Sequence, residues 1–144
     1  MVRSQAGTPD EEGLARLRQI ITNRMDASLI TEGALTTIAK LSGGIPRELI
    51  TLGRLACLEA LVSGHERIDE EVVDAAAWRK RRDYQVLLTS QQLDLLRQVR
   101  KTKRVENEQE YRDLLHNLSV LEYRNHQAWY DVHPLIEALL DDEA

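Results

Sequence analysis

Apolar residues recur every three or four positions over most of the chain, which is the spacing of one face of an α-helix. Leu35, Ile38 and Leu41, for example, share one side of a predicted helix that the glycine pair at 43–44 ends. The same spacing recurs in six other segments. The predicted helices cover approximately residues 10–23, 32–42, 46–63, 69–82, 90–101 and 107–118, with a last short one over 135–140.

Residues that favour helix ends support these boundaries. Pro46 stands where a first helical position is expected, since its missing N–H is not needed there. Asp69 is typical of an N-cap, and Ile68 and Val73 on either side of it can form a hydrophobic staple. The first four helices therefore predict one helical bundle.

The pattern changes after residue 119. Residues 120–124 and 127–132 are rich in aromatic and branched side chains and flank the pair Asn125-His126, which predicts a β-hairpin. Helix, helix, hairpin and helix is the order of a winged-helix module. We therefore expect a mainly α fold: a flexible segment over 1–9, a four-helix bundle over 10–83 and a small α+β winged-helix-like module over 84–144, with a connector from Tyr84 to Thr89.

Composition narrows the class of protein. The 144 residues are 42% hydrophobic and 30% charged, and no apolar run approaches the roughly 20 residues that span a bilayer. Cys57 is the single cysteine, which excludes an internal disulfide and a multi-cysteine zinc site. These features predict a soluble, cytoplasmic protein without a membrane partner.

The charge balance bears on nucleic-acid binding. Nineteen basic and twenty-four acidic residues give a net charge of −5, and residues 84–144 hold seven basic against eleven acidic ones. This sign disfavours DNA as a partner. The module still has a set of basic residues that would carry DNA contact if it occurs: Arg97, Arg100, Lys101, Lys103, Arg104 and Arg124.

The basic run from Trp78 to Arg82 has two interpretations. The residue types suit nucleic acid, with Trp78 as a stacking platform. They equally suit a cationic helix end with Trp78 packed inward, which the helix dipole favours and which we prefer.

No catalytic or metal-binding arrangement is predicted. His65, His116, His126 and His133 share no metal-ligand spacing with one another and no cysteine joins them, so we expect no metal. Cys57 is expected to be a small buried thiol, because no histidine lies near it in the sequence to activate it.

Two stretches carry a family resemblance. Residues 41–49, Leu-Ser-Gly-Gly-Ile-Pro-Arg-Glu-Leu, followed by a helix and by Ile-Asp-Glu-Glu-Val from residue 68, resemble the lid of AAA-type P-loop ATPases. Residues 111–140 resemble the winged-helix end of bacterial ATPases of this class, and lid followed by winged helix is similar to the order in origin-recognition and branch-migration ATPases.

The resemblance implies a role for Arg47. At its position the lid arginine known as sensor 2 reaches the γ-phosphate of bound ATP. An arginine in the first turn of a helix also gains most by pointing at an anion beyond the helix. The alternative is an ion pair with Glu48 or with a neighbouring helix. Arg54, two turns further along the helix, is expected to be a solvated or interface residue and not a second phosphate ligand.

The sequence departs from the family in lacking the phosphate loop. None of the lysines at positions 40, 80, 101 and 103 stands in a Gly-x-x-x-x-Gly-Lys motif. We therefore expect a C-terminal regulatory fragment that is no enzyme on its own and that relays lid motion to the winged-helix module or to a partner protein. The resemblance implies ATP and magnesium for the parent ATPase, and as partners its N-terminal nucleotide-binding domain and neighbouring subunits of a homo-oligomer. The alternative is a winged-helix DNA-binding module with a helical dimerisation or adaptor domain.

Overall fold

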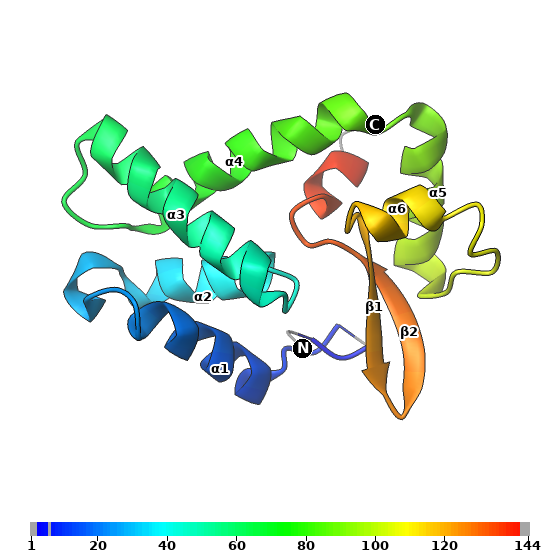
Figure 1. Ribbon diagram of the computed structural model, residues 1–144, viewed down its shortest axis with the longest axis horizontal. Helices are drawn as coiled ribbons and strands as arrows, with labels where there is room; N and C mark the ends of the chain where they lie inside the picture. Colours follow the sequence, from blue (N-terminus) through cyan, green and yellow to red (C-terminus); the bar gives the residue numbers. More distant parts are fainter. Residues whose placement is uncertain (1–2, 6, 142–144) are drawn as a thin grey trace. The chain divides into compact units, whose positions relative to one another are not determined.

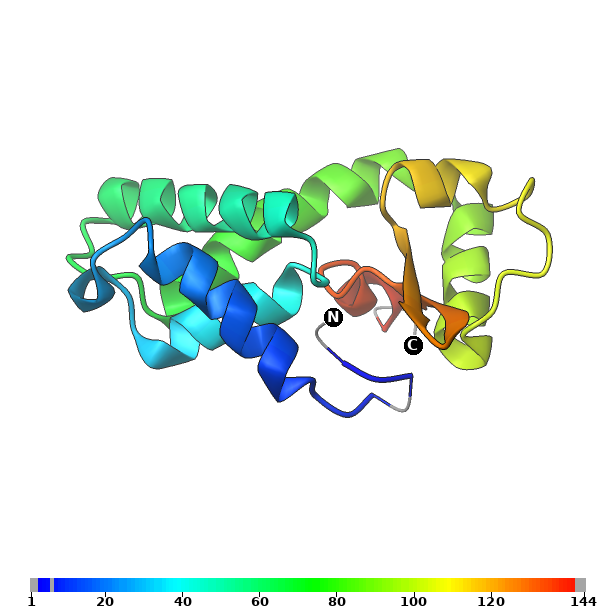
Figure 2. The same cartoon turned by 60° about the horizontal axis from the view of Figure 1, so that its bottom comes forward.

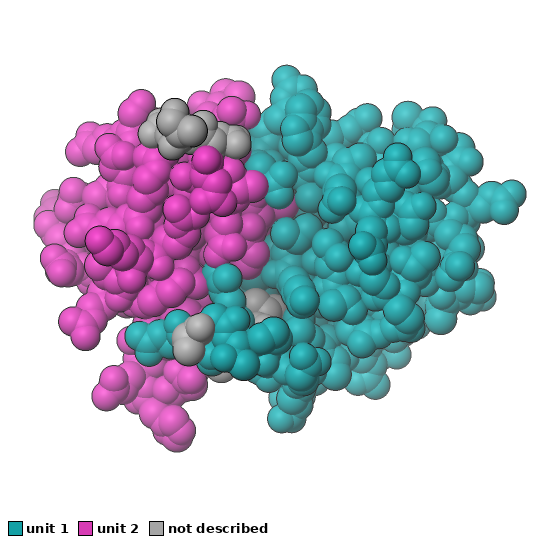
Figure 3. All heavy atoms as spheres, turned by 180° about the vertical axis from the view of Figure 1, so that it is seen from behind, with its two compact units in different colours: residues 1–82 teal, residues 83–144 magenta. Residues whose placement is uncertain are grey.

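The computed structural model describes residues 3–5 and 7–141, and the chain separates into two compact units, Met1–Arg82 and Asp83–Ala144 (Figures 1 and 3). Part of the predicted flexible segment over 1–9, and residues 142–144, lie outside the described residues. As predicted, the chain is mainly helical with one small antiparallel sheet. The elements in order are α1 (Glu11–Thr22), η1 (Ala27–Leu29), α2 (Glu32–Leu41), α3 (Pro46–Ser63), α4 (Glu70–Leu87), α5 (Ser90–Thr102), α6 (Arg112–His116), β1 (Val120–Asn125), β2 (Gln127–Val132) and η2 (Glu137–Leu140), where η marks a 3₁₀-helix.

Side-chain caps mark where α1, α2 and α4 begin. The Gly13 N–H donates to Asp10 Oδ1 at the start of α1, and the Ala34 N–H donates to Thr31 Oγ1 at the start of α2. The Val72 N–H donates to Asp69 Oδ1 over 3.0 Å, which confirms Asp69 as the cap of α4.

The turn between α2 and α3 depends on its glycines. Gly43 and Gly44 have φ angles of 66° and 87°, in the left-handed region that glycine enters without steric cost. Ser42 is fully buried at this turn, where its Oγ donates to the Ala39 carbonyl and accepts from the Gly44 N–H. Pro46 is then the first residue of α3, as predicted, so the turn sets the direction in which α3 begins.

The core of the first unit is built from small and branched aliphatic side chains. Helix α1 packs on both α2 and α3, and Figure 2 shows it lying across them. The side chains that are fully enclosed include Ala34, Ile38, Ala39, Leu49 and Ala56. A parallel bridge between Ile30 and Ile68 ties the segment before α2 to the segment before α4.

Helix α4 is longer than the sequence pattern indicated. The connector predicted from Tyr84 to Thr89 is wrong, because the helix continues to Leu87. No glycine or proline interrupts it, and the chain becomes extended only at Thr89. There the Thr89 side chain accepts from the Gln92 N–H while the Gln92 side chain accepts from the Thr89 N–H, a capping box that starts α5.

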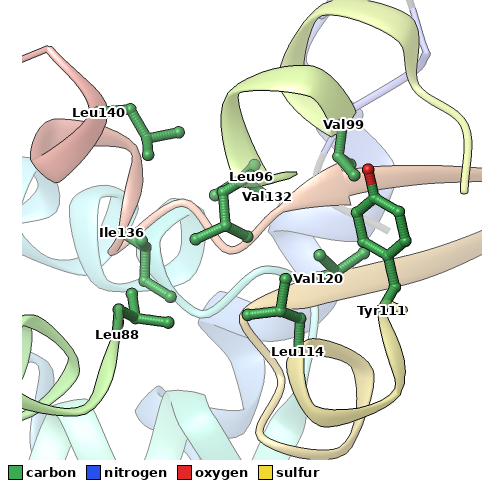
Figure 4. Packing of buried hydrophobic residues seen from close by; sticks show 9 residues of the cluster. All are labelled: Leu88, Leu96, Val99, Tyr111, Leu114, Val120, Val132, Ile136 and Leu140. Carbon is green, nitrogen blue, oxygen red and sulfur yellow. The ribbon is translucent and has the colours of Figure 1, made fainter. Parts of the chain in front are cut away.

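The second unit is a β-hairpin packed against short helices. Strands β1 and β2 pair antiparallel from Val120 opposite Val132 to Asn125 opposite Gln127, and His126 makes the turn with φ of 66°. This is the hairpin that the sequence predicted. Figure 4 shows the cluster that holds it: Leu88, Leu96, Val99, Tyr111, Leu114, Val120, Val132, Ile136 and Leu140.

The helix predicted over 107–118 is mostly a set of turns. Only Arg112–His116 is helical. Asn107 Oδ1 accepts from the Gln109 N–H, which supports a local turn in place of a helix start, and Leu118 with φ of 64° ends the segment. The element that a winged-helix protein would place in a DNA groove is therefore a single short turn of helix.

The close approach of α1 and α3 generates a prediction about Gly53. A Cβ atom at Gly53 would lie 3.3 Å from Ile21 Cδ1, so Gly53→Leu should force α1 away from α3. Overpacking of this kind costs about 1–3 kcal/mol. We expect the urea concentration at the midpoint of unfolding, measured by circular dichroism, to be lower in Gly53→Leu. Arg54→Leu places the same side chain one residue on, where the helix is exposed, and should change stability by less than about 0.5 kcal/mol. Equal effects of the two substitutions would contradict the packing.

Candidate functional site

The first turn of α3 has no capping side chain and carries an exposed cation. Ile45 occupies the N-cap position and provides no side-chain hydrogen bond to the turn. Pro46 has no N–H, so the backbone donors at this end belong to Arg47 and Glu48. Arg47 is exposed on the same turn. The N-terminus of a helix, with its positive dipole end, is a place where anions bind.

The Arg47 guanidinium has no acidic partner within the part of the chain that the structure describes. Its neighbour Glu48 points the other way and pairs with Lys80 of α4. The side chains of Glu48 and Lys80 are only 9% and 13% exposed. The alternative in which Arg47 pairs with Glu48 is therefore wrong: adjacent residues of a helix lie about 100° apart, and here one faces the core and the other solvent.

Arg54 extends the exposed basic face of α3. It lies seven residues after Arg47, which places both side chains on one side of the helix. Among the described residues Arg54 also makes no ion pair. Its exposure agrees with the expectation of a solvated or interface residue.

A shallow groove of about 350 Å³ lies beside the start of α3. It is lined mainly by α1, with Pro46 as the residue of α3 that reaches it. Asp10 and Glu12 contribute carboxylates to its wall, and Arg16 there is already paired with Glu12. A phosphate inside this groove would be repelled by the carboxylates of Asp10 and Glu12. Arg47 does not line the groove, and it offers only one or two contacts to an anion that approaches the end of α3.

Most of the basic residues proposed for DNA contact are engaged within the second unit. The ion pairs join Arg97 to Asp94 (2.8 Å), Arg100 to Asp141 (2.7 Å), Lys103 to Asp131 (2.8 Å) and Arg124 to Glu122 (2.7 Å). Lys101 and Arg104 remain exposed. The structure thus leaves two of the six basic residues without a paired carboxylate in the described chain.

The surface around α6 is acidic. Four carboxylates precede or begin this helix, and all are exposed: Glu106, Glu108, Glu110 and Asp113. Arg112 is the basic residue among them. A DNA backbone brought against α6 would be repelled.

The aromatic residues also differ from expectation. Trp78 is 55% exposed, so the preferred interpretation with Trp78 packed inward is wrong. The buried face of α4 is formed by Val72, Val73, Ala76 and Ala77, and the Arg82 guanidinium lies 5.0 Å from the centroid of the Trp78 ring. Tyr123 and Trp129, which the sequence allows either in the core or on the surface, are buried and stack on each other with ring centroids 4.5 Å apart.

The structure assembles one cluster of metal-ligating side chains that the sequence analysis did not identify. The ligand atoms of His65, Asp69 and Glu71 all lie within 4.8 Å of one another. The spacing His-x-x-x-Asp-x-Glu is visible in the sequence, but it has no second histidine and no cysteine that would mark it as a metal site. Cys57 is elsewhere, half-buried, and burial raises the pKa of its thiol, which favours the unreactive protonated form.

Comparison of the chain with protein-family models, with curated proteins and with solved structures finds no match. Within the described residues, every helix is too short or too polar to cross a lipid bilayer.

The pairing of Lys103 generates a prediction that separates a structural from a DNA-binding role. Asp131 is 1% exposed, so Lys103→Met would remove a cation that lies 2.8 Å from a buried carboxylate. We expect the free energy of unfolding of the second unit to fall by about 2–3 kcal/mol. Lys101→Met, two residues away and exposed, is the control and should leave stability unchanged. Chemical denaturation of both variants measures this, and an unaffected Lys103→Met protein would show that the ion pair contributes nothing.

Proposed function

We propose that this chain is the C-terminal regulatory part of an AAA-type ATPase, in which Arg47 contacts the phosphate of bound nucleotide and the helical unit acts as a lid. The single observation that carries the proposal is an exposed arginine with no acidic partner in the described chain, at a helix N-terminus that has no capping side chain. The resemblance of residues 41–49 to the lid of these ATPases supports the same assignment.

The chemistry of Arg47 suits this role. A guanidinium remains charged at all physiological pH values and binds phosphate oxygens through two parallel N–H donors. The neighbouring N–H groups of α3 and the positive end of its dipole add to the attraction. Because only one side of the anion is contacted, the remaining ligands, the magnesium ion and the phosphate loop would come from the N-terminal nucleotide-binding domain of the parent protein.

Helix α4 offers a route by which lid motion would be relayed. It begins at the Asp69 cap in the first unit and continues without interruption to Leu87, which belongs to the second unit. An unbroken helix transmits displacement better than a flexible linker. The relay would end on the winged-helix-like module, on a partner protein or on a neighbouring subunit of a homo-oligomer.

The DNA-binding alternative has less support. It rests on the two exposed basic residues Lys101 and Arg104, whereas the other four candidates are held in ion pairs and α6 is surrounded by carboxylates. A DNA-binding surface normally shows an excess of basic residues, so we favour protein contact for this module.

The first test uses the chain as it is. In ¹H–¹⁵N spectra recorded during titration with ATP, the amide signals of Arg47 and Glu48 should move, with weak affinity because no cradle is present. Arg47→Ala should remove these shifts without altering the rest of the spectrum, while Arg54→Ala, on the same exposed face, should retain them. Shifts that persist in Arg47→Ala, or that centre on another element, would contradict the assignment.

The second test addresses turnover in a parent ATPase that contains this chain. A charge-assisted contact to phosphate contributes about 1.5–3 kcal/mol, so Arg47→Ala should lower ATP binding or turnover by roughly tenfold or more. The fold should be unaffected, because an exposed first-turn side chain makes little core contact. Steady-state ATPase assays of Arg47→Ala beside Arg54→Ala measure the difference. Unchanged activity in Arg47→Ala would rule out the sensor role.

A further inference from the structure

We propose that His65, Asp69 and Glu71, at the junction of α3 and α4, form a binding site for a divalent transition-metal ion of the zinc class. Their three ligand atoms lie within 4.8 Å of one another. Metal–ligand distances of about 2.0–2.2 Å around a tetrahedral ion place ligands roughly 3.3–3.6 Å apart. Small rotations of the side chains are therefore sufficient to close the site.

The donor set indicates the class of metal. One imidazole nitrogen with two carboxylates suits zinc and its first-row neighbours, while calcium and magnesium prefer oxygen ligands alone. Three protein ligands leave a fourth position for water. The inference does not depend on the proposed nucleotide-sensing role.

The backbone that carries these ligands is held in place on both sides. Before the site, the His65 N–H donates to the Ala60 carbonyl over 2.9 Å, where the chain leaves α3 through Gly64. Between His65 and Asp69, the Ile68 N–H donates to the Leu29 carbonyl over 2.8 Å, and the Thr31 N–H donates to the Ile68 carbonyl over 2.9 Å. The ligands are thus presented by a hydrogen-bonded loop and by the first turn of α4, so their ordering does not have to be supplied by the metal.

Arg67, between the two ends of the loop, does not compete with a cation for the site's carboxylates. Its Nε donates to the Ser28 carbonyl over 2.8 Å. The described ion pairs likewise include neither Asp69 nor Glu71. Both acidic ligands are therefore available to a metal ion.

Each ligand retains a free coordinating atom. Asp69 Oδ1 accepts from the Val72 N–H as the cap of α4, which leaves the second carboxylate oxygen for a metal. Glu71 is exposed in the first turn. The positive end of the helix dipole favours carboxylates at this position and repels a cation. The negative charges of Asp69 and Glu71 offset that repulsion. The dipole gives no reason for a histidine among them, whereas metal coordination does.

Calorimetric titration of the full chain with zinc chloride, in a buffer that does not bind zinc, tests the site. We expect one zinc ion per chain, and at least tenfold weaker binding in His65→Ala and in Glu71→Gln. Asp69→Asn keeps an acceptor for the Val72 N–H while removing the negative charge, and should weaken binding without loss of the helix cap.

Matched controls come from the same chain. His116→Ala removes another exposed histidine, and Glu70→Gln removes the carboxylate next to Glu71. Both variants should bind zinc with the affinity of the unsubstituted protein. Zinc should also raise the midpoint of thermal unfolding, and this rise should be absent in His65→Ala. No heat of binding, or equal weakening in His116→Ala and His65→Ala, would overturn the proposal.

Discussion

The ion pair between Glu48 and Lys80 determines how the first unit presents its charges. It joins α3 to α4 across 32 residues of sequence, and both side chains are almost fully enclosed. Removing two charges from water is costly, and each partner is tolerated in the interior because the other is there. Lys80 is therefore not available to an external partner of the basic run of α4, and Glu48 is not available to Arg47.

The consequence for Arg47 is geometric. One turn of α3 directs a carboxylate inward and a guanidinium outward, although the two residues are adjacent in sequence. Because Glu48 is paired with Lys80, it is not available to Arg47, which makes no ion pair in the described part of the chain. The uncapped amides of the same turn add to this outward preference for an anion.

Internal pairing has the opposite effect in the second unit. Lys103 is bound to the buried Asp131, and Arg100 and Arg124 are each bound to a nearby carboxylate. Basic residues that look like a nucleic-acid surface in the sequence thus become structural, and the exposed charge around α6 is mostly negative. The exposed carboxylates around α6 would repel a phosphate backbone.

The sequence by itself determined the hairpin, most of the helices and several helix boundaries. Asp69, the glycine pair at 43–44 and Pro46 act on backbone groups within a few residues, so their effect can be read locally. The pattern failed where local signals were weak or competed, as at Tyr84, where no residue stops α4, and at Asn107, whose side chain supports a turn. The tertiary structure alone decided which charges are paired, that Trp78 is exposed, and that His65 meets two carboxylates. Those outcomes depend on the direction of each side chain and on contacts between distant segments, which residue spacing does not specify.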